Sequence, residues 1–252
     1  MPEQSDKARA FAALHRPGEP VILYNAWDSG SARAVAEAGA KAIATGSASV
    51  AAAHGFHDAE ALPIELALAN AERVAAAVDL PVTIDFEGAY AADPGGVAAN
   101  IGRLAGTGAI GCNFEDQVIG GEGLHPIEAQ AAKIRAARAL VGPDFFINAR
   151  TDIFLKTKAA THEPAAIEEA LARARAYAEA GASGFFVPGL VDLDQLAHIC
   201  AASPIPVNFM AFPGAPEAAA VAAAGVARIS HGPFPYKLAM AALKDAAEAI
   251  YG

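Results

Sequence analysis

Residues Pro81–Phe86 have the sequence PVTIDF, and residues Ile110–Glu115 have the sequence IGCNFE. Each stretch is short and mostly apolar, as expected for a strand that is buried on both faces of a parallel sheet. The segment between them has the spacing of an amphipathic helix. A strand, a helix and a second strand therefore follow one another, and this order predicts parallel strands joined by a crossover helix.

The same unit recurs along the whole chain. Six further apolar runs read as strands: Pro20–Asn25, Ala42–Gly46, Phe145–Thr151, Gly184–Gly189, Pro206–Ala211 and Ala227–Ser230. Four of the intervening helices end at a glycine that permits a left-handed backbone, namely Gly39, Gly108, Gly181 and Gly225. Eight units in about 250 residues predict an α/β fold, a TIM-type (β/α)8 barrel, with residues 1–252 as a single domain.

The alternative is a doubly wound open sheet. Such a fold normally carries a glycine-rich phosphate loop after its first strand. That position here is occupied by Asn25, Ala26, Trp27 and Asp28, so the barrel is preferred.

Composition excludes several classes of protein. The formal net charge is −10 and the chain has no run of Lys or Arg, which argues against nucleic acid as a partner. No stretch approaches the ~20 apolar residues of a membrane helix, and the polar N-terminus lacks the apolar core of a signal peptide. Two cysteines, Cys112 and Cys200, form no disulfide framework. We therefore expect a soluble, cytoplasmic protein.

Acidic residues gather where two neighbouring predicted strands end, which is where barrel enzymes carry their chemistry. Asp85 and Glu87 alternate along one strand, which would point both side chains the same way. Glu115 ends the next strand. Three carboxylates without His or Cys suit Mg²⁺, or Mn²⁺, better than Zn²⁺. The alternative is that these acids cap helices or pair with arginine.

Arg150 is the second notable residue. It lies in a strand that is otherwise apolar, where an arginine is costly unless it binds an anion. Its planar group suits a substrate carboxylate, although an ion pair with Glu115, Asp116 or Asp152 would explain it equally well. The small, hydroxyl-rich segment Thr45–Ser49 offers backbone N–H groups to the same ligand. No lysine ends a strand, which disfavours a Schiff-base aldolase.

Ordered stretches from Val21 to Tyr236 resemble the isocitrate lyase and phosphoenolpyruvate mutase superfamily. They are YNAWDSGSARAVA (24–36), ATGSASVAAAHGFHD (44–58), PVTIDFEG (81–88), NFEDQ (113–117) and INARTD (147–152). The resemblance implies a barrel that binds one Mg²⁺ and a 2-oxo acid, and that stabilises an enolate. It also implies a homo-oligomer, a dimer or tetramer.

The resemblance assigns roles by position. Asp85 would be the main metal-side carboxylate, with Glu87 and Glu115 holding the metal's waters. Gly46 and Ser47 would donate backbone N–H groups to the substrate, and Arg150 would clamp it. Asp58 matches a position near the family's site. The remaining substrate-binding candidates are Tyr24, Thr45 and Asn208, which stand at or beside strand ends.

Departures from the family pattern limit the assignment. Family members usually have Asp-x-Asp where this chain has Asp85 and Glu87. The loop Val118–Gly123 has neither the Cys of the isocitrate and methylisocitrate lyases nor the Lys and Asn of the mutases, which leaves Glu122 as its sole proton donor. The chain also ends soon after its eighth helix, which leaves open the helix exchange between subunits that is typical of the family.

The preferred function is therefore a Mg²⁺-dependent carbon–carbon lyase acting on a small 2-oxo or 2-hydroxy (di)carboxylic acid, with oxaloacetate decarboxylation as the simplest case. Two alternatives remain. One is carbon–phosphorus chemistry on a phosphonopyruvate-like substrate, and the other is a 2-oxo acid-binding protein with little turnover.

Overall fold

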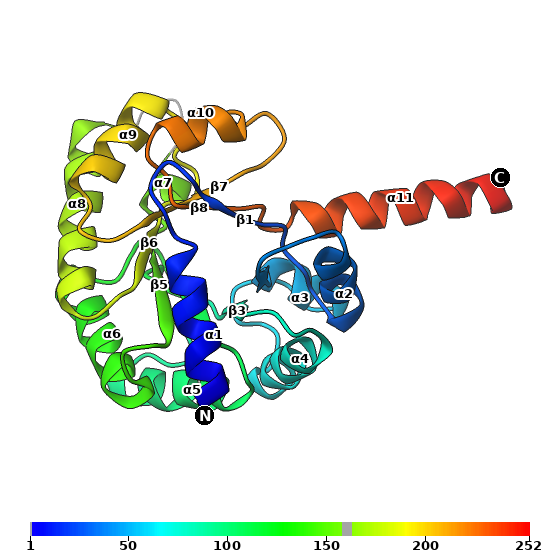
Figure 1. The fold of residues 1–252 in the computed structure, drawn as a ribbon, viewed down its shortest axis with the longest axis horizontal. Helices are drawn as coiled ribbons and strands as arrows, with labels where there is room; N and C mark the ends of the chain where they lie inside the picture. The colour runs from blue at the N-terminus through cyan, green and yellow to red at the C-terminus, as the bar shows by residue number, and fades with distance from the viewer. Residues whose placement is uncertain (1, 158–162) are drawn as a thin grey trace.

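The computed structural model describes residues 2–157 and 163–252, which form an eight-stranded parallel barrel surrounded by helices (Figure 1). Every strand lies inside one of the eight predicted apolar runs, so the predicted fold class is confirmed. The strands are β1 (Val21–Leu23), β2 (Ile43–Ala44), β3 (Val82–Asp85), β4 (Gly111–Glu115), β5 (Phe146–Arg150), β6 (Gly184–Phe186), β7 (Val207–Met210) and β8 (Arg228–Ser230).

The barrel closes between its first two strands. The hydrogen-bonded order runs β1-β8-β7-β6-β5-β4-β3-β2. The gap between β1 and β2 is joined by a parallel bridge between Ala26 and Thr45, and the Ala26 N–H donates to Ala44 O at 2.8 Å. This closure excludes the open sheet.

Helices connect successive strands and form the outer layer. They are α2 (Ser29–Glu37), α4 (Ile64–Ala77), α5 (Pro94–Gly106), α6 (Ile127–Val141), α8 (Pro164–Glu179), α9 (Leu193–Ala202) and α10 (Ala218–Ala223), with the short α3 (Ser47–Ala53) and α7 (Ile153–Lys156) directly after β2 and β5. The four glycines expected to close helices all have φ between +92° and +100°.

Helix α1 (Pro2–Ala13) covers the amino ends of the strands, where it lies across the barrel opening in Figure 1. Its Phe11 is fully buried and meets the Phe146 ring edge-on, with centroids 5.1 Å apart. His15, just after the helix, stacks on the same ring at 4.3 Å. The aromatic side chains of α1 and its C-terminal turn thus fill the amino end of the barrel.

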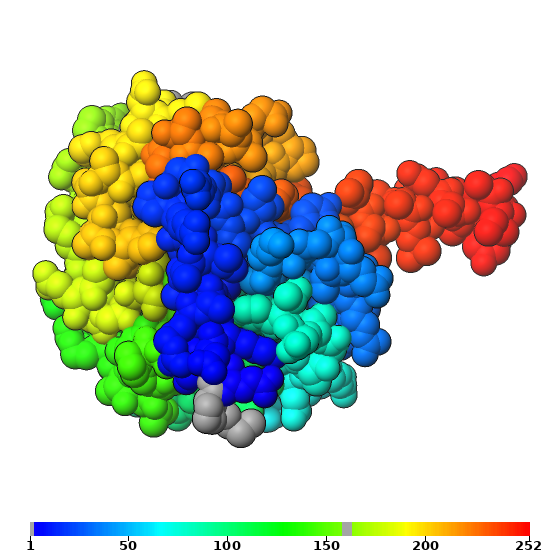
Figure 2. All heavy atoms as spheres, viewed as in Figure 1, coloured from blue at the N-terminus to red at the C-terminus, as the bar shows by residue number. Residues whose placement is uncertain are grey.

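Helix α11 (Phe234–Tyr251) projects away from the barrel and stands clear of the body in the space-filling view (Figures 1 and 2). Large apolar side chains on it are exposed, among them Leu243 and Ile250. The outer face of β1 is also uncovered, since Ile22 is 52% exposed. None of the described helices is both long enough and apolar enough to cross a bilayer.

Candidate active site

A cavity of about 190 Å³ opens at the carboxyl ends of the strands. One part of its wall is polar and the other is apolar, and the β8–α11 connection also lines it through Gly232 and Pro233. Its lining residues are Asn25, Gly46, Ser47, Ala48, Asp58, Asp85, Asn113, Arg150, Leu155, Phe186, Met210, Ser230, Gly232 and Pro233. Five of the residues predicted from the sequence are therefore brought together here: Gly46, Ser47, Asp58, Asp85 and Arg150.

Asp85 ends β3 and is held by hydrogen bonds on both carboxylate oxygens. Its Oδ2 accepts from the Ser47 backbone N–H at 3.0 Å and from the Ser47 hydroxyl at 2.9 Å. Its Oδ1 accepts from Asn113 Nδ2 at 3.3 Å. Donors on both oxygens fix the orientation of the carboxyl group. Asp85 therefore presents an oriented carboxylate to the cavity.

Arg150 ends β5 and reaches the cavity while it is held by two acids. Its Nε and Nη2 donate to the two oxygens of Asp152 at 2.5 and 2.9 Å, and its Nη1 lies 2.8 Å from Glu115 Oε2. These contacts use three of the five guanidinium N–H groups, which leaves two donors for a ligand. Arg150 can therefore hold its ion pairs with Glu115 and Asp152 and bind a ligand at the same time.

The electrostatics of this cluster favour a permanently charged arginine. Burial opposes the charge of Arg150, but Glu115 and then Asp152 more than offset that effect and raise its pKa above the usual range. Burial also raises the pKa of Glu115, whereas the guanidinium lowers it. The Glu115 side chain accepts a short hydrogen bond from Gln117 as well. Glu115 is therefore committed to orienting Arg150, and it does not line the cavity.

Glu87 does not face the cavity beside Asp85, and the strand alternation expected of this pair stops at Asp85. The reason is the backbone, because Glu87 has a left-handed φ of +51°. Its Oε2 accepts from the Glu60 N–H at 2.7 Å, and it borders a second, small cavity of about 20 Å³ that Asp85 also lines. Burial, and then the negative charge of Asp58, raise the pKa of Glu87 to about 8.

Glu87 belongs to a strained pair of loops. Five non-glycine residues in the loops after β2 and β3 have positive φ: Ala59, Glu60, Glu87, Ala89 and Tyr90. The loops are tied together, since Glu60 Oε1 accepts from the Tyr90 N–H at 2.7 Å. Left-handed backbone at such residues costs about 1–3 kcal/mol each and is concentrated at functional sites. The unfavourable backbone conformations in these two loops therefore indicate that this side of the cavity belongs to the functional site.

Asp58 and Glu122 differ in their relation to the cavity. Asp58 is exposed at the cavity rim, where partial desolvation, and then the charge of Asp85, raise its pKa. Glu122 is exposed in the loop after β4 and is not among the lining residues. This loop has internal order, because the Val118 N–H donates to Gly123 O at 3.2 Å.

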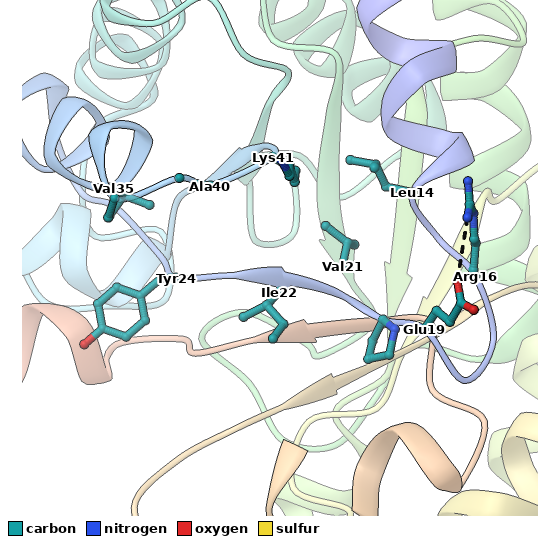
Figure 3. Close-up of a pocket in the computed structure, with 12 residues that line it drawn as sticks. Leu14, Arg16, Glu19, Val21, Ile22, Tyr24, Val35, Ala40 and Lys41 are labelled. Atoms are coloured by element: carbon teal, nitrogen blue, oxygen red, sulfur yellow. Dashed lines mark ion pairs between the residues drawn. The ribbon is translucent and has the colours of Figure 1, made fainter. Parts of the chain in front are cut away.

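Four further predictions need correction. The Gly46 and Ser47 amides were expected to cradle the substrate, but they donate to Ala26 O and to Asp85. Thr45 is buried behind the wall, where its hydroxyl accepts from the Asp85 N–H at 3.1 Å. Asn208 is buried deeper in the barrel. Tyr24 faces outward into the groove beside β1, with Ile22 and Val35 (Figure 3), because alternate residues of a strand point to opposite faces.

The expected set of three metal-binding carboxylates is not gathered around one point. Within residues 2–157 and 163–252, no three His, Cys, Asp or Glu side chains form a group able to hold a metal ion. Asp85 lines the cavity, Glu115 is paired with Arg150, and Glu87 is bonded to a backbone amide. Of the three, only Asp85 lines the larger cavity, and Asp85 and Glu87 both border the small one.

Sequence reasoning missed the apolar wall of the cavity and gave no role to its two asparagines, Asn25 and Asn113. Leu155, Phe186 and Met210 follow or end β5, β6 and β7. A strand-end apolar residue looks the same in sequence as a core residue, so no signal distinguished them. Asn25 and Asn113 carried a signal, since both are polar residues at strand ends.

A barrel with this cavity, an oriented aspartate and a buried arginine defines the class as the phosphoenolpyruvate mutase/isocitrate lyase superfamily of lyases and mutases. The family model described as phosphoenolpyruvate phosphomutase matches residues 11–251, and the chain belongs to this family.

Individual relatives agree with this assignment. A structure from Burkholderia cenocepacia J2315, provisionally named a phosphonomutase, is similar at 48% identity with a TM-score of 0.95 over 98% of this chain and 99% of that one. An uncharacterized protein of Mycobacterium tuberculosis is 35% identical over 96% of this chain and 88% of its own length. 2,3-Dimethylmalate lyase is similar in structure at 27% identity, with a TM-score of 0.83 over 97% and 87% of the two chains.

Proposed function

We propose that this protein is a Mg²⁺-dependent lyase that acts on a small 2-oxo or 2-hydroxy (di)carboxylic acid through an enolate. The observation that carries the proposal is the pairing, in one cavity of about 190 Å³, of the Asp85 carboxylate with the Arg150 guanidinium. A cavity of this size suits a small acid rather than a nucleotide or a sugar chain. The name of the 2,3-dimethylmalate lyase relative supports carbon–carbon bond cleavage.

The residues fit a magnesium ion. Mg²⁺ usually keeps several waters and is bound in enzymes through one or two carboxylates together with substrate oxygens. Asp85 would supply the direct protein ligand, and Asn113 and Ser47 orient its carboxylate. When bound, the ion would stabilise negative charge that develops on the substrate oxygen.

The chain's own residues would divide the remaining work. Arg150 would bind the C1 carboxylate through its two unused N–H groups, while Glu115 and Asp152 hold the guanidinium in place. Leu155, Phe186 and Met210 would exclude water from the far side of the substrate. In a decarboxylation the C3–C4 bond would break and C4 would leave as carbon dioxide. The electron pair of that bond would form the enolate, which would then take a proton from water at C3.

Carbon–phosphorus chemistry is the second candidate. The provisional name of the Burkholderia cenocepacia relative, at 48% identity, favours it. The same Arg150 and Asp85 would serve a phosphonopyruvate-like substrate, because that molecule is also a 2-oxo acid. The two candidates differ in the bond that breaks beyond C3.

Steady-state assays of the purified protein with Mg²⁺ test both candidates. The panel contains oxaloacetate, 2-hydroxy dicarboxylates such as dimethylmalate, and phosphonopyruvate. We expect turnover of a carbon-only acid, and we expect Asp85→Asn to remove most activity together with the thermal stabilisation by Mg²⁺. Asp93→Asn, an exposed helix cap, is the matched control. Binding of 2-oxo acids without turnover would instead support a binding protein, and neither binding nor turnover would end the proposal.

We further propose a cytoplasmic homo-oligomer. Both cysteines are free thiols, which suits a reducing compartment. A second copy of the chain is the occupant we expect for a second groove, of about 490 Å³, which is lined by Ile22, Tyr24 and Val221 among others and is distinct from the groove in Figure 3. The first turns of α11 form part of the groove wall through Phe234 and Leu238. The rest of α11 projects away, and its exposed apolar side chains match the groove in character.

A further inference from the structure

Arg228 lies in β8, inside the barrel, and is fully buried. Its Nη2 donates to Asn113 Oδ1 at 3.2 Å. Its Nε and Nη1 have no hydrogen-bond partner, and none of the ion pairs among the described residues includes it. The other well-buried arginines differ, because Arg150 and Arg173 are each paired with carboxylates.

A lone buried guanidinium is costly, so its position in the fold requires a reason. Burial lowers the pKa of Arg228 to about 10, and the charge of Asp85 opposes that shift. The Arg228 guanidinium also lies over the Phe11 ring, 6.0 Å from its centroid. Asp85 is therefore the carboxylate that interacts electrostatically with Arg228.

Arg228 belongs to a polar layer directly beneath the cavity. Barrel interiors are usually filled by branched apolar side chains. Here the register places Asp85 beside Asn113, Asn113 beside Asn148, and Asn208 beside Arg228. Asn148 Nδ2 donates to Asn113 Oδ1 at 2.8 Å and to Asn208 Oδ1 at 3.0 Å.

This layer fixes the orientation of the Asn113 amide. Its Oδ1 accepts from both Arg228 and Asn148, so its Nδ2 must face the cavity side, where it donates to Asp85 Oδ1 at 3.3 Å. The Asn113 side chain thus transmits the position of Arg228 to the carboxylate that lines the cavity.

The charges around the cavity also require Arg228. Glu115 and Asp152 together outweigh the charge of Arg150, and Asp85 and Asp58 add two further acids to the lining. These four carboxylates would outweigh even the three positive charges of Arg150 and a bound Mg²⁺, so without Arg228 an anionic ligand would meet a net negative field. The positive charge of Arg228 acts strongly on the cavity, because the barrel interior screens a buried charge poorly.

We propose that Arg228 is a positioning residue that orients Asp85 through Asn113 and supplies the buried positive charge that favours an anionic ligand in the cavity. This inference rests on the proposed function, since it assumes that the cavity takes a 2-oxo acid. It assigns Arg228 no contact with the substrate.

Binding of oxalate, a planar dianion that mimics an enolate, tests the inference without any turnover. We would measure its affinity by calorimetry with Mg²⁺ present, for the wild-type protein and for Arg228→Met, Arg228→Gln and Arg228→Lys. The first two remove the charge and should weaken oxalate binding by about tenfold or more. Arg228→Lys keeps both a charge and N–H donors and should stay within about threefold of wild type.

Arg138→Met is the matched control. Arg138 donates to the backbone oxygens of Gly181 and Phe145, away from the cavity, so its loss should lower the melting temperature without changing oxalate affinity. A purely structural Arg228 would behave in the same way. Folded Arg228→Met or Arg228→Gln that binds oxalate within twofold of wild type would overturn the inference. If neither folds, a loss of more than tenfold in Arg228→Lys would overturn it.

The same measurement separates two kinds of failure. If the wild-type protein does not bind oxalate with Mg²⁺, the proposed function fails and this inference fails with it. If the wild type binds oxalate and the neutral variants bind it equally well, the proposed function stands and Arg228 is only structural.

Discussion

At the scale of single residues, Arg150 is the side chain on which we propose that substrate binding depends. Three of its N–H groups are used by Glu115 and Asp152, so a ligand can bind only through the remaining two. Arg150→Lys keeps the charge, but one ammonium group cannot satisfy both acids and a carboxylate. We expect a rise in KM equivalent to about 2 kcal/mol, the usual strength of a charge-assisted pair.

Steady-state kinetics on the best substrate of the panel would measure this change. Arg103→Lys is the control, because Arg103 makes an exposed ion pair with Glu65 far from the cavity. A KM for Arg150→Lys within twofold of wild type would show that the arginine serves only its ion pairs.

His15 gives the protein a predictable sensitivity to acid. Burial, followed by the charge of Arg228, lowers its pKa from 6.5 to about 3. The unfolded chain therefore binds a proton at pH 5 that the folded chain refuses, and stability falls as the pH falls below 6.5. At pH 5 this single group should cost about 2 kcal/mol relative to pH 8.

Urea unfolding of wild type and His15→Phe at both pH values would measure the effect. The difference between the two proteins should shift by about 2 kcal/mol in favour of the variant at pH 5. A wild-type and His15→Phe difference that does not depend on pH would contradict the assignment.

Residue chemistry at the site was only partly predictable from the sequence. Arg150 was predictable, because an arginine in an apolar strand requires a partner. Arg228 carries the same signal in the run Ala227–Ser230, but a single charged residue in a short run is easily assigned to its end. The orientation of Glu87 was not predictable, since its left-handed backbone arises from the facing loop that holds Glu60.

At the scale of elements, the eight strands were predictable because each is a bounded apolar run in a repeated unit. The structure of the loop after β4 was harder to predict, since its three glycines indicate mobility and give no sign of the hydrogen-bonded turn that the loop forms. In the structure it is a small ordered turn, with Gln117 bridged to Leu124 and the Gly121 N–H donating to Val118 O at 3.1 Å. Mobility without a ligand therefore stays a prediction.

This loop decides whether the enzyme supplies its own proton. Glu122 is exposed and does not line the cavity, which favours water as the donor. We expect Glu122→Gln to leave kcat within about twofold of wild type. A loss of about 10²-fold, the usual scale for general acid catalysis, would instead show that the loop closes and delivers Glu122. Glu128→Gln, on the first turn of α6, controls for the loss of one nearby charge.

At the scale of the whole molecule, α11 is the element that a single barrel does not use. The barrel was the preferred fold because the sequence contains eight strand–helix units. The direction of the last helix was not predictable, because an apolar helix face can pack on its own barrel or on the barrel of a second subunit. Met240, Leu243, Ala247 and Ile250 recur at spacings of three and four and lie on one face of the helix. Such a stripe left in water indicates a missing partner.

The test is therefore the oligomeric state. We expect the wild-type protein to be a dimer or larger by size-exclusion chromatography with light scattering. Leu243→Glu places a charge in the middle of the stripe and should shift the protein to monomer, because burying that charge against an apolar groove is costly. Ala241→Glu adds the same charge on the opposite face of α11 and should leave the assembly intact. A monomeric wild-type protein, or an oligomer that Leu243→Glu does not weaken, would show that α11 is not the interface.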